Sequence, residues 1–321
     1  MTASTPIGIS GADAADGSLA VDLGGTNMRV AVVASGGSFV DHDHAPTPHD
    51  ATTIAPFLDL LERVRTKYAL EHAVIAVPGR VDHEAGTLLH APNLPPAWRE
   101  QLTRDALERE LELDVTLAND ADVAAVGEAF FGAGTGYRDV VYVTVSTGVG
   151  AGAVIDGRVL LPRRSGGEVG HTVIDRVAAA AGEESTVEGL GSGTALGRLA
   201  GNRGIEARGA DLVQLVRDDD AGARAAWDEA MAAVGIGIAN LVHVLAPDVV
   251  VVGGGVGRNG EIVLAPVRDA IERYGPAGTP PDVVTAALGD DPGLMGAAAW
   301  RRATGHPSSI RAAHPRSSHE R

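Results

Sequence analysis

The chain has 321 residues, a formal net charge of −16 and no cysteine, and only 3% of its residues are aromatic. That length exceeds what one compact core usually organises, so two lobes are expected. The missing cysteines exclude disulfides and thiolate metal sites, and the lack of a long Lys and Arg cluster argues against direct nucleic-acid binding.

Neither end of the chain predicts a targeting signal or a membrane anchor. The N-terminal segment has no basic start followed by an apolar core. No apolar run reaches the ~20 residues needed to span a bilayer. We therefore expect a cytoplasmic location, with no membrane and no nucleic acid among the partners. Residues 1–17 and 304–321 are small or polar and are predicted to be disordered tails.

Between these tails, short β-branched runs alternate with helical stretches. In chain order, the pattern predicts strand Leu19–Leu23, strand Met28–Ala34, helix Ala55–Leu70, strand Ala73–Val77, helix Asp105–Leu113, strand Val115–Leu117, helix Ala121–Phe131, strand Val140–Val145, strand Gly152–Ile155, helix Ala221–Leu245, strand Val249–Val252 and a helix over about Gly293–Arg302. No internal repeat of fixed period is visible. Because only a short glycine turn separates the first two strands, they form a hairpin. The predicted fold class is α/β with mixed sheets.

Three of the strands end in a glycine loop, at Asp22–Thr26, Ser146–Gly152 and Gly253–Gly255. Glycine lets the backbone approach a ligand closely, so that N–H groups can point at phosphate oxygens. A dinucleotide-binding fingerprint is excluded, because its glycines must open a helix and the first loop leads into strand Met28–Ala34. A P-loop is excluded because the pattern G-x-x-x-x-G-K-[ST] does not occur. One such loop alone would be an ordinary tight turn, whereas three together favour a phosphate site.

A hairpin tipped by Asp, two Gly and Thr, followed much later by a second glycine hairpin, resembles the actin-like, ribonuclease-H-like phosphotransferases. In that superfamily the two hairpins hold the phosphates of ATP from opposite lobes, and a third loop meets the adenosine. The resemblance implies that Asp22 lies near Mg²⁺, directly or through water. It also implies that Thr26 or Thr147 donates to phosphate oxygens.

Further motifs narrow this resemblance to one family. In chain order they are DLGGTNMR (Asp22–Arg29), PNLP (Pro92–Pro95), ND (Asn119-Asp120), TGVGAG (Thr147–Gly152), GGEVGH (Gly166–His171), EGLGSGTAL (Glu188–Leu196) and GLMGAAAW (Gly293–Trp300). This set and its order resemble the ROK family of bacterial sugar kinases and sugar-responsive repressors. The resemblance implies a two-lobed actin-like ATPase fold with an interlobe cleft. It divides the chain into a small lobe, 18–118, and a large lobe, 119–290, with helix 291–303 packing back on the small lobe.

The same resemblance assigns the site residues. It makes Asp120 the catalytic base that accepts the proton of the sugar hydroxyl. An isolated Asn-Asp pair would more simply begin the helix Ala121–Phe131, and both roles can hold together. The implied sugar-binding residues are Gly79, Asn93, Asn119, Asp120, Glu168, His171 and Glu188. The implied ATP-binding residues are Asp22, Gly24, Gly25, Thr26, Asn27, Arg29, Ser146, Thr147, Gly148, Gly150, Gly254 and Gly255.

The sequence departs from the family at a zinc site. Many ROK proteins bind zinc through a histidine and three cysteines, and here Ala179, Ala181 and Thr186 occupy the cysteine places. A closed cysteine site cannot form without cysteine, so no zinc is expected. A sugar contact is then the remaining role for His171. The composition of Ile174–Val187 predicts a short helix or a mobile segment.

The expected activity is ATP- and Mg²⁺-dependent phosphorylation of a hexose, from glucose to glucose 6-phosphate. A kinase for N-acetylmannosamine, N-acetylglucosamine or another hexose stays open, because these sugars use the same Glu and His residues. A repressor needs a DNA-binding domain, and only about eighteen polar residues precede Leu19. A non-catalytic sugar-binding regulatory protein also stays open. The family resemblance implies a homodimer.

Overall fold

The computed structural model describes residues 17–305. The tails predicted to be disordered lie outside this part of the chain, except for Gly17, Thr304 and Gly305. Contacts within the chain define two compact units, which are described separately below. Unit 1 comprises the chain up to Asn119, Leu161–Arg164 and the chain from Ala297, whereas unit 2 comprises Asp120–Leu160 and Ser165–Gly296.

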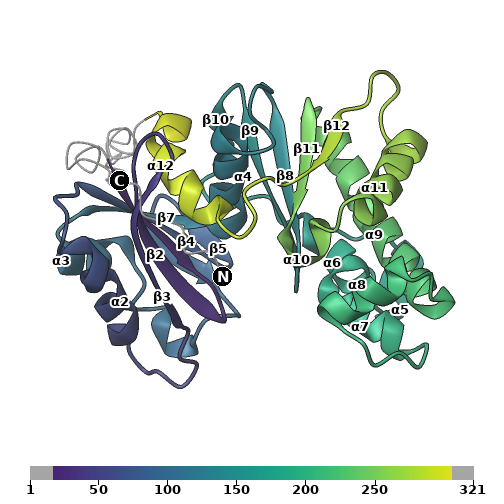
Figure 1. Cartoon of the computed structure of the whole chain (residues 1–321), viewed down its shortest axis with the longest axis horizontal. Coiled ribbons are helices and arrows are strands. Elements are labelled where there is room, and N and C mark those ends of the chain that lie inside the picture. Colours follow the sequence, from purple (N-terminus) through teal and green to yellow (C-terminus); the bar gives the residue numbers. More distant parts are fainter. Residues whose placement is uncertain (1–16, 306–321) are drawn as a thin grey trace, which may run out of the picture. The chain divides into compact units, whose positions relative to one another are not determined.

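Unit 1 contains a five-stranded mixed sheet in the order β3-β2-β1-β4-β7 (Figure 1). Its strands are β1 (Ser18–Leu23), β2 (Asn27–Val33), β3 (Phe39–Pro46), β4 (His72–Val77) and β7 (Asp114–Asn119). β1 pairs with β2 and β2 with β3 in antiparallel fashion, whereas β1–β4 and β4–β7 are parallel. The predicted hairpin and the predicted mixed sheet are therefore confirmed.

The core of unit 1 lies between one face of this sheet and two helices. These are α2 (Ala55–Arg65) and α3 (Arg104–Leu111). Inward-facing strand residues such as Leu19 and Val30 pack in one cluster with Phe57 and Trp98, all of them fully buried. A two-stranded ribbon, β5 (Arg80–Asp82) and β6 (Thr87–His90), and the short helix η1 (Pro96–Trp98) complete the unit.

The segment Leu161–Arg164 belongs to unit 1, although the sequence prediction placed it within 119–290. Its backbone joins the β5–β6 ribbon through a bridge between Asp82 and Arg164 and a bond from His83 N–H to the Arg163 carbonyl (2.9 Å). An ion pair between Arg163 and Glu84 (2.7 Å) adds to this contact. Such pairings join residues far apart in the chain, so local patterning gives no sign of them.

Unit 2 repeats the strand arrangement of unit 1 in a second mixed sheet, ordered β10-β9-β8-β11-β12. The strands are β8 (Val140–Val145), β9 (Val149–Ile155), β10 (Arg158–Val159), β11 (Val249–Gly253) and β12 (Asp282–Thr285). Again the first three strands form antiparallel hairpins, and the last two add in parallel. The duplication is one of topology, which explains why no sequence repeat of fixed period is visible.

The helices of unit 2 include the long α9 (Ala221–Leu245), whose bounds match the prediction. The others are α4 (Asp120–Phe131), α5 (Arg176–Ala181), α6 (Val187–Gly191), α7 (Gly193–Gly201), α8 (Gly209–Arg217), α10 (Gly254–Gly257) and α11 (Glu261–Tyr274), with the short helix η2 (Val169–His171). The last helix, α12 (Pro292–Thr304), begins in unit 2 and ends in unit 1. Asp220 caps α9 by accepting a bond from Ala223 N–H (2.8 Å).

Among the described residues, α9 is the one helix that is long and apolar enough to cross a membrane. Half of its most apolar stretch is buried within the structure. Trp227, Met231 and Val234 of α9 are fully buried in the same cluster as Val141 and Val250 of the sheet. The helix thus has the packing of a core element.

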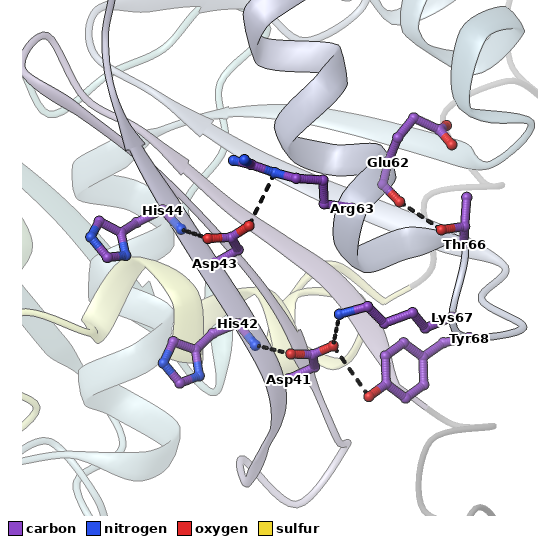
Figure 2. Close-up of polar contacts among 9 residues, drawn as sticks. All are labelled: Asp41, His42, Asp43, His44, Glu62, Arg63, Thr66, Lys67 and Tyr68. Carbon is purple, nitrogen blue, oxygen red and sulfur yellow. Dashed lines mark hydrogen bonds and ion pairs between the residues drawn. The ribbon is translucent and has the colours of Figure 1, made fainter.

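The sheet of unit 1 ends in a polar edge strand, β3, which the sequence pattern did not predict. Asp41 accepts a bond from Lys67 Nζ (2.9 Å), and Arg63 pairs with Asp43 (3.1 Å), so both carboxylates face the α2 side (Figure 2). The alternating His42 and His44 point the other way and are exposed. Burial raises the pKa of Asp41, but the bonds from Lys67 and His42 outweigh it and lower the pKa overall. Because β3 contains several charged and polar residues, its sequence is typical of a loop.

Several predicted element bounds need correction. The helix predicted over Ala55–Leu70 ends at Arg65, and the strand predicted over Val115–Leu117 runs from Asp114 to Asn119. The triple-glycine loop after β11 opens the short helix α10. Helices α6, α7, α8 and α11 and strand β12 were not predicted. Glycine interrupts α6 and α7, and β12 has only four residues. The signal was present in α8 and α11, whose buried residues have helical spacing, such as Leu212 and Val216 on α8 and Val263 and Val267 on α11.

Candidate active site

The turn between β1 and β2 is fixed by bonds to its backbone. Gly24 N–H donates to the Asn27 carbonyl (2.9 Å), and the Thr47 hydroxyl donates to the Gly24 carbonyl (2.7 Å). A Cβ on Gly25 would lie 2.8 Å from the carbonyl oxygen of Asn93 and 2.9 Å from its Cβ. Only glycine permits this approach. The structure therefore brings the predicted phosphate turn against Asn93, a predicted sugar residue.

Asp22 and Arg29 face each other across the β1–β2 hairpin below this turn. Arg29 donates to Asp22 Oδ2 from Nη2 (2.5 Å) and from Nε (3.2 Å). Both side chains are about a quarter exposed. Thr26 and Asn27 are exposed at the tip of the turn. An acidic oxygen, a guanidinium group and a hydroxyl are thus presented together on one hairpin.

Asn119 ends β7, and its side chain forms a hydrogen bond to a glycine of positive φ. Asn119 Nδ2 donates to the carbonyl of Gly79 (2.8 Å). Gly79 has a φ of +121°, and a Cβ there would collide with the His90 carbonyl. A non-glycine residue is excluded at this position for both reasons. Unit 1 therefore joins two of the predicted sugar residues by a direct hydrogen bond.

Asp120, the first residue of α4, is exposed, and its Oδ1 accepts a bond from Ala121 N–H (2.9 Å). Two residues further along α4, Asp122 is 2% exposed. Burial raises the pKa of Asp122 well above its usual value, and the charges of Asp120 and Glu168 raise it further. Sequence reasoning missed Asp122, whose only signal is a second carboxylate at the start of an otherwise apolar helix. The structure therefore places the carboxyl groups of Asp120 and Glu168 within electrostatic reach of Asp122.

The second glycine turn joins β8 to β9. Ser146 N–H donates to the Gly148 carbonyl (2.8 Å), and Ser146 and Thr147 are exposed at the tip. Val149 N–H donates to Glu188 Oε2 (2.9 Å), and any side chain on Gly148 would collide with the same oxygen. Glu188, predicted to bind sugar, therefore also holds the predicted phosphate turn in place.

The segment carrying Glu168 and His171 lies directly on β9. Gly167 has a φ of +73°, its carbonyl accepts a bond from Ala151 N–H (2.9 Å), and a Cβ there would collide with the Ala151 carbonyl. At Gly170 a Cβ would meet the backbone of Val149. His171 Nε2 lies 3.7 Å from Glu168 Oε2, and its side chain is 65% exposed. The glycines therefore allow this segment to lie flat and to hold both side chains at the surface.

The segment Ile174–Val187 forms the predicted short helix, α5, and is closed by its own backbone. Asp175 Oδ1 caps α5 by accepting bonds from Val177 N–H (2.9 Å) and Ala178 N–H (3.0 Å). Gly182, with a φ of +74°, ends the helix. A bridge between Val173 and Thr186 closes the loop, and the Thr186 hydroxyl caps α6, the helix that carries Glu188. Backbone pairing thus orders this loop of a cysteine-free chain.

A pocket of about 630 Å³ opens beside the second glycine turn, entirely within unit 2. Its polar lining comes from Ser146, Thr147, Thr194, Arg208, Arg258 and Asn259. Its apolar lining comes from Leu196, Leu212, Val213, Trp227 and Val256. The Thr194 hydroxyl donates to the Thr147 carbonyl (2.9 Å), which fixes the turn at the pocket wall. The pocket has the size and mixed lining of a small-molecule site.

The structure separates the predicted ATP-binding residues of unit 2 into two groups. Ser146, Thr147 and Gly255 line the pocket. Gly254 has a φ of +82°, and a Cβ there would collide with the Val145 carbonyl. Glycine at this position therefore allows α10 to begin directly after β11, with Gly255 in the pocket lining. Gly148 and Gly150 lie outside the lining. Sequence analysis gave no role to Thr194, although it lies in the motif Glu188–Leu196. Arg208, Arg258 and Asn259 were not predicted, because they lie in none of the motifs.

Comparison with known proteins gives concordant matches over nearly the whole described chain. The model of the ROK family matches residues 18–304. A glucokinase of Halalkalibacterium halodurans is 32% identical over 305 residues, which cover 86% of this chain and 92% of that protein. A glucokinase of Streptomyces coelicolor is 31% identical over 313 residues, with coverages of 87% and 96%. The crystal structure of a ROK family glucokinase from Streptomyces griseus in complex with glucose and AMPPNP superposes with a TM-score of 0.74 at 30% identity, covering 88% of this chain and 98% of that one.

Proposed function

The chain belongs to the ROK family, and we propose that it is an ATP-dependent sugar kinase that phosphorylates glucose to glucose 6-phosphate. The observation that carries this proposal is the similarity, over 88% of the chain, to a ROK glucokinase whose structure holds glucose and AMPPNP. The sequence prediction of the family and of a two-lobed actin-like fold is confirmed by the same comparisons. The glucokinase relatives also bear out the prediction of an ATP-dependent sugar kinase.

In the proposed reaction, Asp120 accepts the proton of the attacking sugar hydroxyl. Its exposed carboxylate at the start of α4 suits this role, because a general base must reach the proton that it removes. The first turn of a helix also favours a negative charge at this position. Asp122, buried behind it with a raised pKa, adds no second negative charge while it stays protonated.

The glycine turns are proposed to hold the triphosphate of ATP. N–H groups of Gly25 and Thr26 and of Thr147 and Gly148 suit phosphate oxygens, with Thr26 and Thr147 also as hydroxyl donors. When bound, Mg²⁺ neutralises charge on the β- and γ-phosphates. Asp22 would hold it, directly or through water, since a carboxylate oxygen suits a hard cation. Arg29, paired with Asp22, would hold that carboxylate in place.

The proposed hexose-binding side chains are Asn93, Asn119, Glu168, His171 and Glu188. Amide, carboxylate and imidazole groups match a ring of sugar hydroxyls, because each can donate to or accept from them. Kinases for N-acetylmannosamine or N-acetylglucosamine remain the second candidate, since the same side chains would serve those sugars. A homodimer and a cytoplasmic location complete the proposal, from the family resemblance and the use of ATP.

The experiment that tests this function is an ADP-release assay with ATP, Mg²⁺ and a panel of hexoses and N-acetylhexosamines. We expect the highest kcat/KM with glucose. A higher kcat/KM with an N-acetylhexosamine would show that the chain is an N-acetylhexosamine kinase, the second candidate. No turnover with any sugar would favour the alternative of a non-catalytic sugar-binding protein.

A further inference from the structure

The pocket beside the second glycine turn contains one cation whose charge is not balanced by a carboxylate. This cation is Arg208, the residue directly before α8, which lines the pocket and is exposed. Within residues 17–305 its guanidinium group takes part in none of the ion pairs or side-chain hydrogen bonds. Arg258, the other cation of the lining, is paired with Asp290. Among the described residues, the guanidinium group of Arg208 therefore has no carboxylate partner that would compete with a ligand in the pocket.

Arg208 is held at a definite place along the pocket. Its guanidinium lies against Gly197 of α7, where any Cβ would collide with it. On the same helix, Gly193 N–H donates to the carbonyl of Ser146 (2.7 Å) in the glycine turn. Gly197 follows Gly193 by one helical turn, about 6 Å along the axis at ~1.5 Å per residue. Arg208 is thus displaced from the turn proposed to hold the phosphates, by roughly the length of a ribose.

Next to Arg208 along the chain, the pocket has an apolar wall. Leu212 and Val213 follow on α8, and the buried ring of Trp227 lies behind them with its Nε1 donating to the Ile262 carbonyl (2.7 Å). Apolar side chains of this kind accept a flat ring better than a phosphate, which would lose its hydration there. A guanidinium group, being planar, stacks well on the face of an aromatic ring.

We propose that Arg208 stacks on the purine ring of the nucleotide and closes the base end of the pocket, which makes it the residue that distinguishes a nucleotide from a simple polyphosphate donor. This assignment rests on the proposed function, because ATP is the nucleotide concerned. It names a contact to the base, whereas the glycine turns account for the phosphates. Arg258 differs from Arg208 in that Asp290 balances its charge.

The test is direct binding of two probes, adenosine and ATP, to the full chain by isothermal titration calorimetry. For Arg208→Ala we expect the affinity for both probes to fall by the same factor, about tenfold, because the lost contact is to the base. Arg208→Lys should regain less than half of this loss, since Lys has no planar face. Arg224→Ala is the matched control: Arg224 pairs with Asp228 on α9 and does not line the pocket.

Two results would overturn the proposal. Adenosine affinity within twofold of the wild-type value in Arg208→Ala would show that the base does not contact Arg208. Loss of ATP affinity alone, restored by Arg208→Lys, would place Arg208 on a phosphate. If instead the wild-type chain binds both probes but phosphorylates no sugar, the proposed kinase function fails, and the adenosine result still decides the role of Arg208.

Discussion

Glu128 of α4 is fully buried, and its carboxylate binds the backbone of two separate segments. Its Oε2 accepts bonds from Ala133 N–H (2.8 Å) and Ala287 N–H (3.0 Å), and its Oε1 accepts one from Leu288 N–H (2.9 Å). The first donor follows α4, and the other two lie in the connection from β12 to α12. We predict that neutralising or removing this carboxylate destabilises unit 2.

The size of the effect follows from the three donors. Glu128→Gln keeps the shape, but its amide has one oxygen, so at least one backbone N–H then faces an NH₂ group. The remaining bonds change from charge-assisted to neutral, which are roughly half as strong. With an unsatisfied buried donor costing about 1–3 kcal/mol, we expect the free energy of unfolding to fall by about 2–3 kcal/mol. Glu128→Ala, which removes every bond, should cost about 3–5 kcal/mol.

Urea unfolding followed by tryptophan fluorescence measures this loss, because Trp227 and Trp300 are buried. Glu272→Gln is the matched control, since Glu272 is exposed on α11, and it should change the free energy of unfolding by no more than about 0.5 kcal/mol. A loss for Glu128→Gln that equals the control would refute the reasoning. It would mean that the three bonds do not stabilise the fold.

Two further predictions concern the neighbourhood of the site. Because the folded-state pKa of Asp122 is raised, its stabilising contribution is complete below the unfolded pKa of about 3.9 and is lost as pH rises toward the folded value. Asp122→Asn should therefore gain stability relative to wild type as pH rises from about 4 to 8. If the free energies of unfolding of the two proteins, measured by urea unfolding, change equally with pH over this range, the prediction is wrong. Asp175→Ala should speed hydrogen exchange at Val177 and Ala178 about fivefold, for a cap worth ~1 kcal/mol. Asp175→Ser should restore protection, and unchanged exchange in the alanine variant would show that the cap does not order α5.

The elements that could be predicted are those whose signals lie within one stretch of chain. The helix Ala221–Leu245 matched because Asp220 caps it, its apolar pattern is continuous, and Pro247 follows closely. The hairpin at Gly24 matched because its turn is flanked by two β-branched runs. The glycines around Glu168 also indicated a tight segment, and the structure shows why Gly167 and Gly170 are needed.

Several features escaped prediction because they depend on contacts with other parts of the chain. The carboxylates of β3 are balanced by Lys67 and Arg63, so a charged stretch forms an edge strand. Two of the three donors to Glu128 lie about 160 residues away along the chain, and Arg208 contacts Gly197 of α7 across a loop. Asp122 looks in the sequence like an ordinary acidic residue at a helix start, and only its burial shows otherwise. The order of apolar and polar residues within one segment does not indicate contacts with other segments.

The proposed glucose kinase reaction depends on Asp120 as its general base. Its most direct test is the rate of glucose 6-phosphate formation from ATP and glucose by Asp120→Asn, compared with wild type and with Asp105→Asn, an exposed acidic residue in the first turn of α3. We expect kcat to fall by about 10²–10⁴-fold in Asp120→Asn, with glucose binding retained, and the control to keep full activity. A kcat above about a tenth of the wild-type value in Asp120→Asn would exclude Asp120 as the base, since loss of a general base lowers kcat by much more than tenfold.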